Sequence, residues 1–407
     1  MNEKRAIQRL VEVTNIPTAA GLEAEVMRYV LRWADKLDGV AVRHDEYGNL
    51  LISKKGAGRR SGKPILLTAH LDHPAFVVQE VLEDGWAVWA DFRGGVRDEF
   101  FVGSKVRLHG GVGRFDNEPT ARGWLKRVMD SGRRDDERRR KPVGEIEELM
   151  AVDAKQGRLD KRCLIRFGRK SGVCVGDMLT WAVSGSKVVG KRLKAPVCDD
   201  LAAVAAAMVA FEAIYIGRKG KGNVGVDVRL LFTRCEEVGF IGAMGACRSG
   251  LIPQGAHLVV LENSKSFVGD SPIGGGPIIR VGDRISTFNH ELNHRITQIA
   301  EELRKDQKGF AYQRKLMPGG ACESTAYQAF GYQTTCLCLP LGNYHNMNEE
   351  TNRIDREVIS TVDYLNLIAL LVAVGKGLNS VSKDGEGSLQ ERLDKLFISR
   401  VRLLKKQ

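Results

Sequence analysis

The chain has 407 residues, 43% of them hydrophobic and 28% charged, so it is long enough for two domains and has the composition of a globular protein. It lacks the roughly 20 uncharged apolar residues in a row that a membrane-spanning helix needs, and it does not begin with the pattern of a secretion signal. We therefore expect a cytoplasmic protein with no membrane partner. The formal net charge of +12 would suit nucleic acid, but the basic residues gather at 133–141 and 400–406 without interleaved aromatic residues, which argues against that partner.

The N-terminal quarter predicts two helices followed by three strands. Apolar residues between 2 and 37 have helical spacing, interrupted from Pro17 to Gly21, so a helix is expected on each side of the break. Residues 40–56 predict two strands joined by a turn around Gly48. The apolar run at 64–72, PILLTAHLD, is typical of a central strand covered on both faces, with its polar groups emerging at the carboxyl end.

The spacing of apolar residues changes after residue 90, and a pattern of strands and helices returns after Pro196. Short alternating segments broken by glycines predict a small β-rich, barrel-like domain at 91–185. After Pro196, strands alternate with helices again, which predicts an α/β fold with a mostly parallel sheet and helices on both faces. We assign residues 1–90 and 186–407 to this α/β domain and regard 91–185 as a domain inserted into it.

Metal-binding side chains follow several of the predicted strands. His70 and Asp72 are two residues apart at the end of one strand, so they can meet on the same side, and a metal-bound imidazole commonly donates its other N–H to a carboxylate. Asp199 precedes an alanine-rich helix, where an aspartate can cap the helix or reach inward. Taken alone, each of these short motifs is explained at least as well by a structural role.

Two further strands end in carboxylates and a third is followed by a histidine. Glu236 and Glu237 are adjacent and face different ways, so one can bind a metal while the other remains free as a base. Glu262 closes the apolar run HLVVLEN, and His345 follows the run TTCLCLP. Two histidines and three carboxylates can hold two zinc ions, with one carboxylate bridging them.

In chain order, the motifs AHLDHPAF, APVCDDLAA, TRCEEVGFIGA, GGGPIIRVGDR and the YH of GNYHNMNEE resemble the cocatalytic zinc aminopeptidases of the glutamyl-aminopeptidase and tetrahedral-aminopeptidase type. The resemblance covers most of the chain. It implies His70 and Glu262 on one ion, Glu237 and His345 on the other, and Asp199 between them. It also implies that Asp72 orients His70 and that Glu236 is the general base. The ions would be two divalent metals per subunit, zinc above cobalt or manganese, and the protein would be a homo-oligomer acting on peptides.

Three departures from the family pattern stand out. The family usually has aspartate where Glu262 stands. Its glycine-rich segment normally continues GGTDA, whereas this chain reads GGACE from Gly319 to Glu323, which bears on substrate specificity. The basic run at 131–141 is also unusual, and it bears on the twelve-subunit shell of the family.

These parts predict a metal-dependent aminopeptidase in which a hydroxide bridging two metals attacks the N-terminal peptide bond while Glu236 moves the proton. A zinc carboxypeptidase or an N-acyl-amino-acid deacylase with the same metal core is the alternative. In those relatives the extra domain follows the fourth ligand, whereas here the long interval lies between Asp72 and Asp199. A non-catalytic binding protein that uses the basic run and tail is a more remote alternative, since every ligand and base position is filled.

Overall fold

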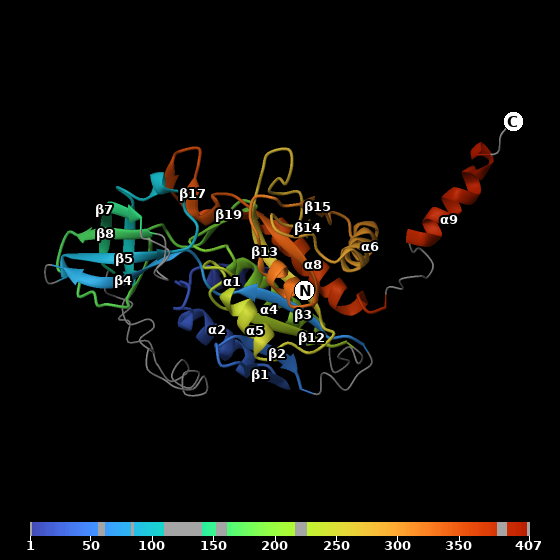
Figure 1. Cartoon of the computed structure of the whole chain (residues 1–407), viewed down its shortest axis with the longest axis horizontal. Helices are drawn as coiled ribbons and strands as arrows, with labels where there is room; N and C mark the ends of the chain where they lie inside the picture. Colours follow the sequence, from blue (N-terminus) through green and yellow to red (C-terminus); the bar gives the residue numbers. More distant parts are fainter. Residues whose placement is uncertain are drawn as a thin grey trace.

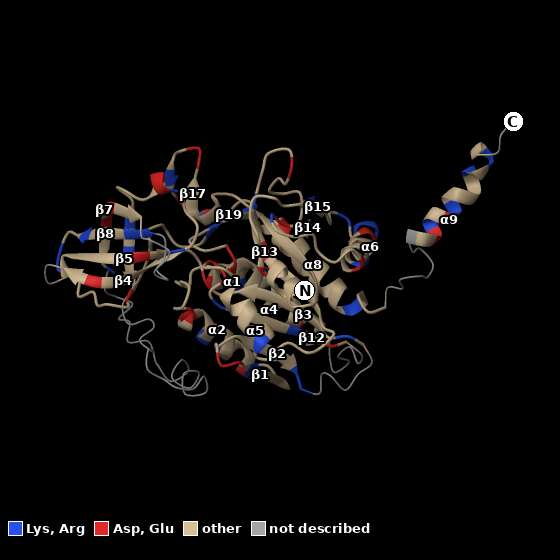
Figure 2. Cartoon of the chain, viewed as in Figure 1, with Lys and Arg blue, Asp and Glu red and all other residues tan. Residues whose placement is uncertain are grey.

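The structure is a computed structural model that describes residues 2–55, 62–82, 85–109, 141–151, 161–215, 226–380 and 389–404. It contains an α/β unit and, beside it, a smaller body made of strands (Figure 1). Lysines and arginines are interspersed with acidic residues over both bodies (Figure 2). Of the basic run at 133–141, only Lys141 lies within the described residues. In the part of the chain that the structure describes, no helix is both long and apolar enough to cross a bilayer.

An eight-stranded sheet forms the centre of the α/β unit, in the order β1-β2-β12-β3-β13-β16-β14-β15. In that order the strands span Val40–His44, Leu50–Lys54, Val228–Thr233, Ile65–His70, His257–Lys265, Gln333–Leu341, Ile278–Gly282 and Gln313–Leu316. The four strands β12, β3, β13 and β16 run parallel to one another. Every residue of β3 is buried, as its continuous apolar run predicts for a strand covered on both faces. Because these strands are parallel, their carboxyl ends meet at one edge of the sheet.

Helices cover both faces of this sheet, and the alternation along β3 shows why. Ile65 and Leu67 pack into one hydrophobic core, whereas Leu66 between them packs into the other. The first core lies against α1 (Glu3–Val13), α2 (Ala24–Asp35), α4 (Leu201–Tyr215), α6 (His290–Asp306) and α8 (Thr361–Gly377). The second lies against α5 (Ile241–Arg248) and α7 (Glu323–Ala329). The predicted α/β class, with helices on both faces of a mostly parallel sheet, is confirmed.

The smaller body is a closed six-stranded barrel in the order β4-β5-β8-β7-β6-β9. The strands span, in chain order, Ala75–Leu82, Ala87–Arg93, Lys105–His109, Val143–Ala151, Lys161–Phe167 and Met178–Trp181. Its core is a cluster of aromatic rings in edge-to-face and tilted contacts: Phe76, Phe92, Phe101 and Trp181. The barrel therefore starts at β4, ahead of the boundary that we expected at residue 91.

Short elements connect the two bodies and complete the chain. A small sheet joins β10 (Lys187–Val189), β11 (Arg192–Ala195) and β19 (Glu357–Ser360), and β17 (Met347–Asn348) pairs with β18 (Arg353–Ile354). Within the described residues, 3-10 turns include η2 (Asp98–Phe100), η4 (Tyr344–Asn346) and η5 (Val401–Leu404). The last helix, α9 (Leu389–Arg400), extends away from the α/β unit and exposes Leu396 and Phe397 (Figure 1).

Candidate metal centre

Five side chains singled out from the sequence converge beyond the carboxyl ends of the parallel strands. His70 is the last residue of β3, and Asp199 directly precedes Asp200 and α4. Glu237 lies in the loop after β12, and His345 lies in η4 after β16. Glu262 lies within β13, three residues before its end, so that strand continues past the site. These residues are far apart in the sequence. The sheet brings them together, because the carboxyl ends of neighbouring parallel strands lie side by side.

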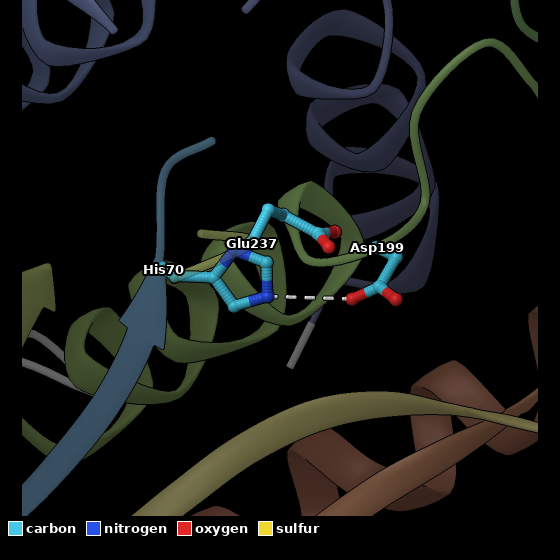
Figure 3. A group of neighbouring side chains, drawn as sticks. All are labelled: His70, Asp199 and Glu237. Atoms are coloured by element: carbon cyan, nitrogen blue, oxygen red, sulfur yellow. Dashed lines mark ion pairs between the residues drawn. The ribbon is translucent and has the colours of Figure 1, made fainter. Parts of the chain in front are cut away.

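Asp199 lies between the two histidines. Its Oδ1 is 3.4 Å from Nε2 of His70, and its Oδ2 is 3.6 Å from Nε2 of His345. Figure 3 shows the Asp199 carboxylate directed at His70, with Glu237 beside the pair. One carboxylate that offers a separate oxygen to each imidazole is the arrangement a ligand shared by two cations requires.

Each histidine also has a carboxylate of its own. Glu237 Oε1 is 3.3 Å from Nε2 of His345, and Glu262 Oε2 is 3.9 Å from Nε2 of His70. The ligand atoms of His70, Asp199 and Glu237 all lie within 4.8 Å of one another. Two overlapping groups of side chains result, one centred on each imidazole, and they share Asp199.

The burial of these groups fits cations between them. Asp199 Oδ1, Glu237 Oε1 and Glu262 Oε1 are buried, yet they accept no hydrogen bond from any described residue. Burial raises the pKa of Glu236 and of Glu262 well above the usual value. Two like charges about 4 Å apart repel by roughly 4 kcal/mol at an effective dielectric constant near 20. The carboxylates of the centre outnumber its two imidazoles, so the imidazoles alone do not neutralise them. Oxygen and imidazole donors with unsatisfied lone pairs suit a borderline cation such as Zn²⁺.

Hydrogen bonds fix the direction of both imidazoles. Nδ1 of His345 lies 2.6 Å from the carbonyl oxygen of Gly95 and donates to it, which leaves Nε2 to face Asp199 and Glu237. Nδ1 of His70 lies 3.2 Å from the backbone carbonyl of Asp72 and 3.6 Å from its Oδ1. Burial lowers the pKa of both imidazoles, but the surrounding carboxylates outweigh burial and raise it overall. A cation bound in the centre would take the place of the proton that the carboxylates otherwise favour on each imidazole.

Asp72 also contacts the loop that carries the paired glutamates, which its spacing from His70 did not reveal. Its Oδ1 accepts the backbone N–H of Glu236 at 2.9 Å, and its Oδ2 accepts that of Glu237 at 3.0 Å. The Asp72 carboxylate therefore holds the paired glutamates as well as facing the histidine. Oε2 of Glu236 lies 4.0 Å from Nε2 of His70, at the outer limit of an ion pair, which leaves this carboxylate beside the centre.

Asp200 lies close enough to join the centre, but its oxygens are engaged elsewhere. One oxygen of Asp200 comes within 4.8 Å of ligand atoms of Asp199 and Glu262. However, Oδ1 accepts from the Asn263 amide at 2.9 Å and Oδ2 from the backbone N–H of His70 at 3.3 Å. Asp200 therefore links β13 to the end of β3 beside the centre.

The sequence interpretation missed Glu357, which joins two ligand segments. Its Oε2 accepts the backbone N–H groups of Cys198 at 2.6 Å and Asp199 at 3.0 Å, and its Oε1 accepts that of His345 at 2.9 Å. Burial raises its pKa to about 7. Nothing in the sequence points to this residue, because it begins β19 and is separated from both segments it holds. A buried carboxylate that binds only backbone amides is visible in the structure alone.

We expect Glu357→Gln to weaken divalent cation binding by about 10- to 100-fold, which is the usual effect of removing a partner that orients a ligand. The amide keeps the size of the side chain but turns one acceptor into a donor, so it faces a backbone N–H of Asp199 or His345. Chelator competition followed by a chromogenic zinc indicator measures the change. Asp363→Asn is the matched control, because Asp363 is also buried and accepts two backbone N–H groups, those of Gly274 and Gly276. Equal losses in both variants would contradict a specific role for Glu357.

The unusual GGACE segment ends in a buried carboxyl group. Glu323 is the first residue of α7 and is fully buried, and its Oε2 accepts from the hydroxyl of Thr68 at 3.3 Å. Burial raises its pKa to about 7. The Tyr327 hydroxyl lies 3.5 Å from the same oxygen. Glu323 is thus a buried carboxyl group that lies beside β3 and is surrounded by hydroxyl groups.

Comparison with known proteins identifies the family. A sequence model of the M42 glutamyl aminopeptidase family matches residues 48–362, which include all the side chains of the centre. The chain belongs to the M42 glutamyl aminopeptidase family. As a member of that family it is a metal-dependent aminopeptidase, a hydrolase of peptide bonds. No curated protein matches the chain.

Solved aminopeptidase structures share the fold of this M42 protein. An aminopeptidase from the archaeon Desulfurococcus kamchatkensis has a TM-score of 0.68 at 20% identity, over 92% of this chain and 95% of that one. A TET aminopeptidase from a marine sediment thaumarchaeote has a TM-score of 0.67 at 20% identity, over 93% and 98%. The TET1 peptidase of Pyrococcus horikoshii, which can assemble into a tetrahedron or an octahedral shell, has a TM-score of 0.65 at 20% identity, over 91% and 99%. At these identities the likeness establishes the fold.

Proposed function

We propose that this aminopeptidase works with two divalent cations, held as two overlapping sets. His70 and Glu262 would hold one cation, His345 and Glu237 the other, and Asp199 would bind both. The position of Asp199 supports this assignment most strongly, since each of its oxygens faces a different imidazole. The number of unsatisfied carboxylate oxygens supports two cations over one. Imidazole and carboxylate donors favour zinc, with cobalt or manganese as substitutes.

The cations and the side chains around them have different roles in the reaction. When bound, the cations supply Lewis acidity, which lowers the pKa of a water molecule and polarises the carbonyl of the scissile bond. Glu236 takes the proton of the attacking water and delivers it to the departing amine. Burial raises the pKa of the Glu236 carboxyl, which makes the carboxylate a stronger base. Asp72 keeps Glu236 in place through the backbone and His70 in place through Nδ1.

Recognition of a free amino terminus follows from the charge of the centre. The carboxylates of Glu236, Glu237 and Glu262 surround the candidate cation sites. The positively charged amine of a bound substrate would therefore be attracted to them. A blocked amine would lose this interaction and would place an acyl group in its position. The barrel also lies between His70 and Asp199 in the chain, as expected for an aminopeptidase. We therefore propose cleavage after the first residue of peptides.

A panel of substrates tests this specificity. We expect the zinc-loaded enzyme to hydrolyse aminoacyl-p-nitroanilides with a free amine and to leave their N-acetylated counterparts intact, at equal substrate concentration. Colour release at neutral pH, repeated with cobalt and manganese, measures both the amine requirement and the preferred metal. Hydrolysis of the blocked substrates alone would replace this proposal with the deacylase alternative.

We further propose a homo-oligomer in the cytoplasm, with residues 91–185 contributing to subunit contacts or to substrate entry. The assembly of the Pyrococcus horikoshii TET1 peptidase supports an oligomer. All eight cysteines are unpaired, which suits a reducing compartment. Gel filtration with light scattering measures the subunit number directly.

A further inference from the structure

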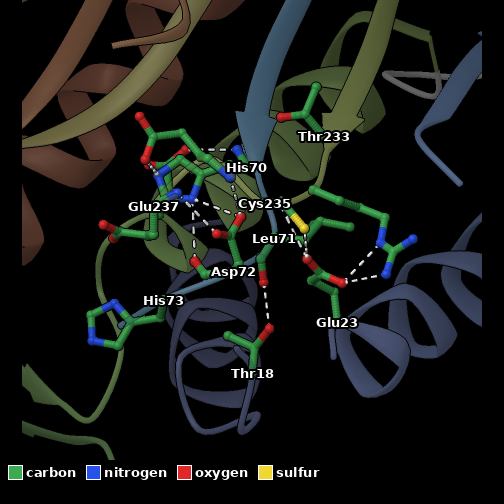
Figure 4. Close-up of polar contacts among 12 residues, drawn as sticks. Thr18, Glu23, His70, Leu71, Asp72, His73, Thr233, Cys235 and Glu237 are labelled. Carbon is green, nitrogen blue, oxygen red and sulfur yellow. Dashed lines mark hydrogen bonds and ion pairs between the residues drawn. The ribbon is translucent and has the colours of Figure 1, made fainter. Parts of the chain in front are cut away.

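The segment between α1 and α2, Thr18–Glu23, touches the parts of the chain that carry the centre. The hydroxyl of Thr18 donates to the carbonyl of Leu71, between His70 and Asp72, at 2.7 Å. From the barrel, Arg93 donates to the carbonyl of Ala20 at 2.5 Å. The apolar side chains of this segment, Ala19 and Leu22, pack on the barrel strands β4 and β9. Figure 4 shows Thr18 below the end of β3, next to Leu71, and Glu23 to the right of it, next to Cys235.

Glu23 is fully buried, and both of its oxygens bind the loop that carries the paired glutamates. Its Oε2 forms an ion pair with Arg234 at 2.8 Å. Its Oε1 accepts the backbone N–H of Cys235 at 3.1 Å and that of Gly21 at 2.8 Å, and it lies 3.5 Å from the Cys235 thiol. Neither oxygen is directed at the cation sites. The contacts of Glu23 therefore end at the two residues that immediately precede Glu236.

The backbone of this loop needs such support. Cys235 has a φ of 55°, in the left-handed region, which is unfavourable for a residue with a side chain. After this turn at Cys235, the backbone N–H groups of Glu236 and Glu237 reach the carboxylate of Asp72. The carboxylate of Asp72 secures the two residues after the turn, and that of Glu23 secures the turn itself. Hydrogen bonds to a charged group are among the stronger ones in proteins, so these contacts stabilise the unfavourable conformation.

We propose that Glu23 is a positioning residue for the general base, acting through Arg234 and the backbone of Cys235. This inference rests on the proposed function, in which Glu236 moves the proton. A displacement of about 1 Å in a catalytic group can cost about 100-fold in rate, so the turn at Cys235 must be held accurately. Glu23 holds it from the N-terminal segment, which is distant in sequence from every ligand.

Glu23→Gln tests this role with little change in size. In the variant an amide N–H₂ faces either the Cys235 N–H or the Arg234 guanidinium, both of which are donors, and the ion pair is lost. We expect kcat to fall by about 10- to 100-fold, with KM changed by less than about 2-fold and with two equivalents of zinc still bound when zinc is in excess. Steady-state kinetics on a leucine p-nitroanilide and metal analysis after gel filtration measure these quantities in the full chain.

Glu212→Gln is the matched control. Glu212 forms an ion pair with Arg9 at 2.7 Å and accepts from the Trp33 indole at 2.6 Å, away from the centre. We expect this variant to lose thermal stability while its kcat at 25 °C stays at the wild-type value. If Glu23→Gln behaves in the same way, Glu23 is only structural and the inference fails. Loss of bound zinc from Glu23→Gln in excess zinc would also overturn it, because the segment would then serve the ligands.

Glu236→Gln, measured alongside, separates this inference from the proposed function. An active Glu236→Gln enzyme would refute the assignment of the base, whatever Glu23 does. An inactive Glu236→Gln enzyme together with wild-type kcat in Glu23→Gln would overturn the inference on Glu23 alone.

Discussion

Glu236→Gln is expected to lower kcat by about 100- to 10,000-fold while both cations remain bound. Glutamine keeps the shape of the side chain and its acceptor oxygen, but it cannot take a proton from water. The backbone N–H of Glu236 still donates to Asp72 at 2.9 Å, so the loop keeps its position. Single-turnover kinetics with a chromogenic substrate and metal analysis of the same sample check both halves of the prediction.

The neighbouring glutamate supplies the control. Glu237→Gln removes a charge 3.3 Å from Nε2 of His345 and is expected to weaken the cation on that histidine. The two variants should therefore differ in zinc content more than in stability. If Glu236→Gln empties a site and Glu237→Gln does not, the roles of base and ligand are exchanged.

Asp199→Asn is expected to weaken both cations, because each oxygen of Asp199 faces a different imidazole. Asparagine would offer one oxygen and one amide N–H₂, so either His70 or His345 would face a donor in place of an acceptor. Disrupting a buried charged group costs about 3–5 kcal/mol, which corresponds to roughly a 100-fold or greater loss in affinity. Zinc stoichiometry measured against a series of chelator concentrations follows both sites.

Retention of one equivalent at wild-type affinity would show that Asp199 binds a single ion. Asp45→Asn is a suitable control for folding. Asp45 is buried and accepts the backbone N–H groups of Tyr47 and Asn49, in the turn between β1 and β2. It should bind two equivalents of zinc like the wild type, even if its melting temperature falls.

Much of the fold could be predicted because local patterns and global packing agree. The continuous apolar run of β3 is buried along its whole length, and the alanine-rich segment forms α4 with nearly all its residues buried. The turn around Gly48 joins β1 to β2, and Gly48 has a φ of 84°. The start of the barrel was harder to predict, because β4 follows β3 after a short connection and its apolar residues resemble those of the main sheet.

The candidate side chains could be selected because four of them sit close to the end of a predicted strand, while Asp199 precedes a predicted helix. Parallel strands bring such ends together whatever their separation in sequence, so His70 and Glu237 could be expected to meet. Their detailed roles in binding and proton transfer remain predictions that the variants above test. The order of strands in the sheet, which decides which ends are neighbours, is not encoded in any local pattern.

The supporting carboxylates could not be foreseen. Glu23 and Glu357 bind backbone N–H groups, and every residue except proline presents that group, so no partner can be recognised from its type. Asp200 likewise binds the side-chain amide of Asn263 and the backbone N–H of His70, two partners that are distant from it in the sequence. Such contacts depend on three-dimensional placement within a few tenths of an ångström.

The wide spacing of the centre along the chain has a consequence for biosynthesis. Its proposed ligands are drawn from positions between His70 and His345, and Glu357 must also be present to secure Asp199. A nascent chain on the ribosome therefore cannot assemble the site until most of the polypeptide has emerged. We therefore expect metal binding to follow the completion of the sheet. The metal would then stabilise a chain that has already folded and would not initiate its folding.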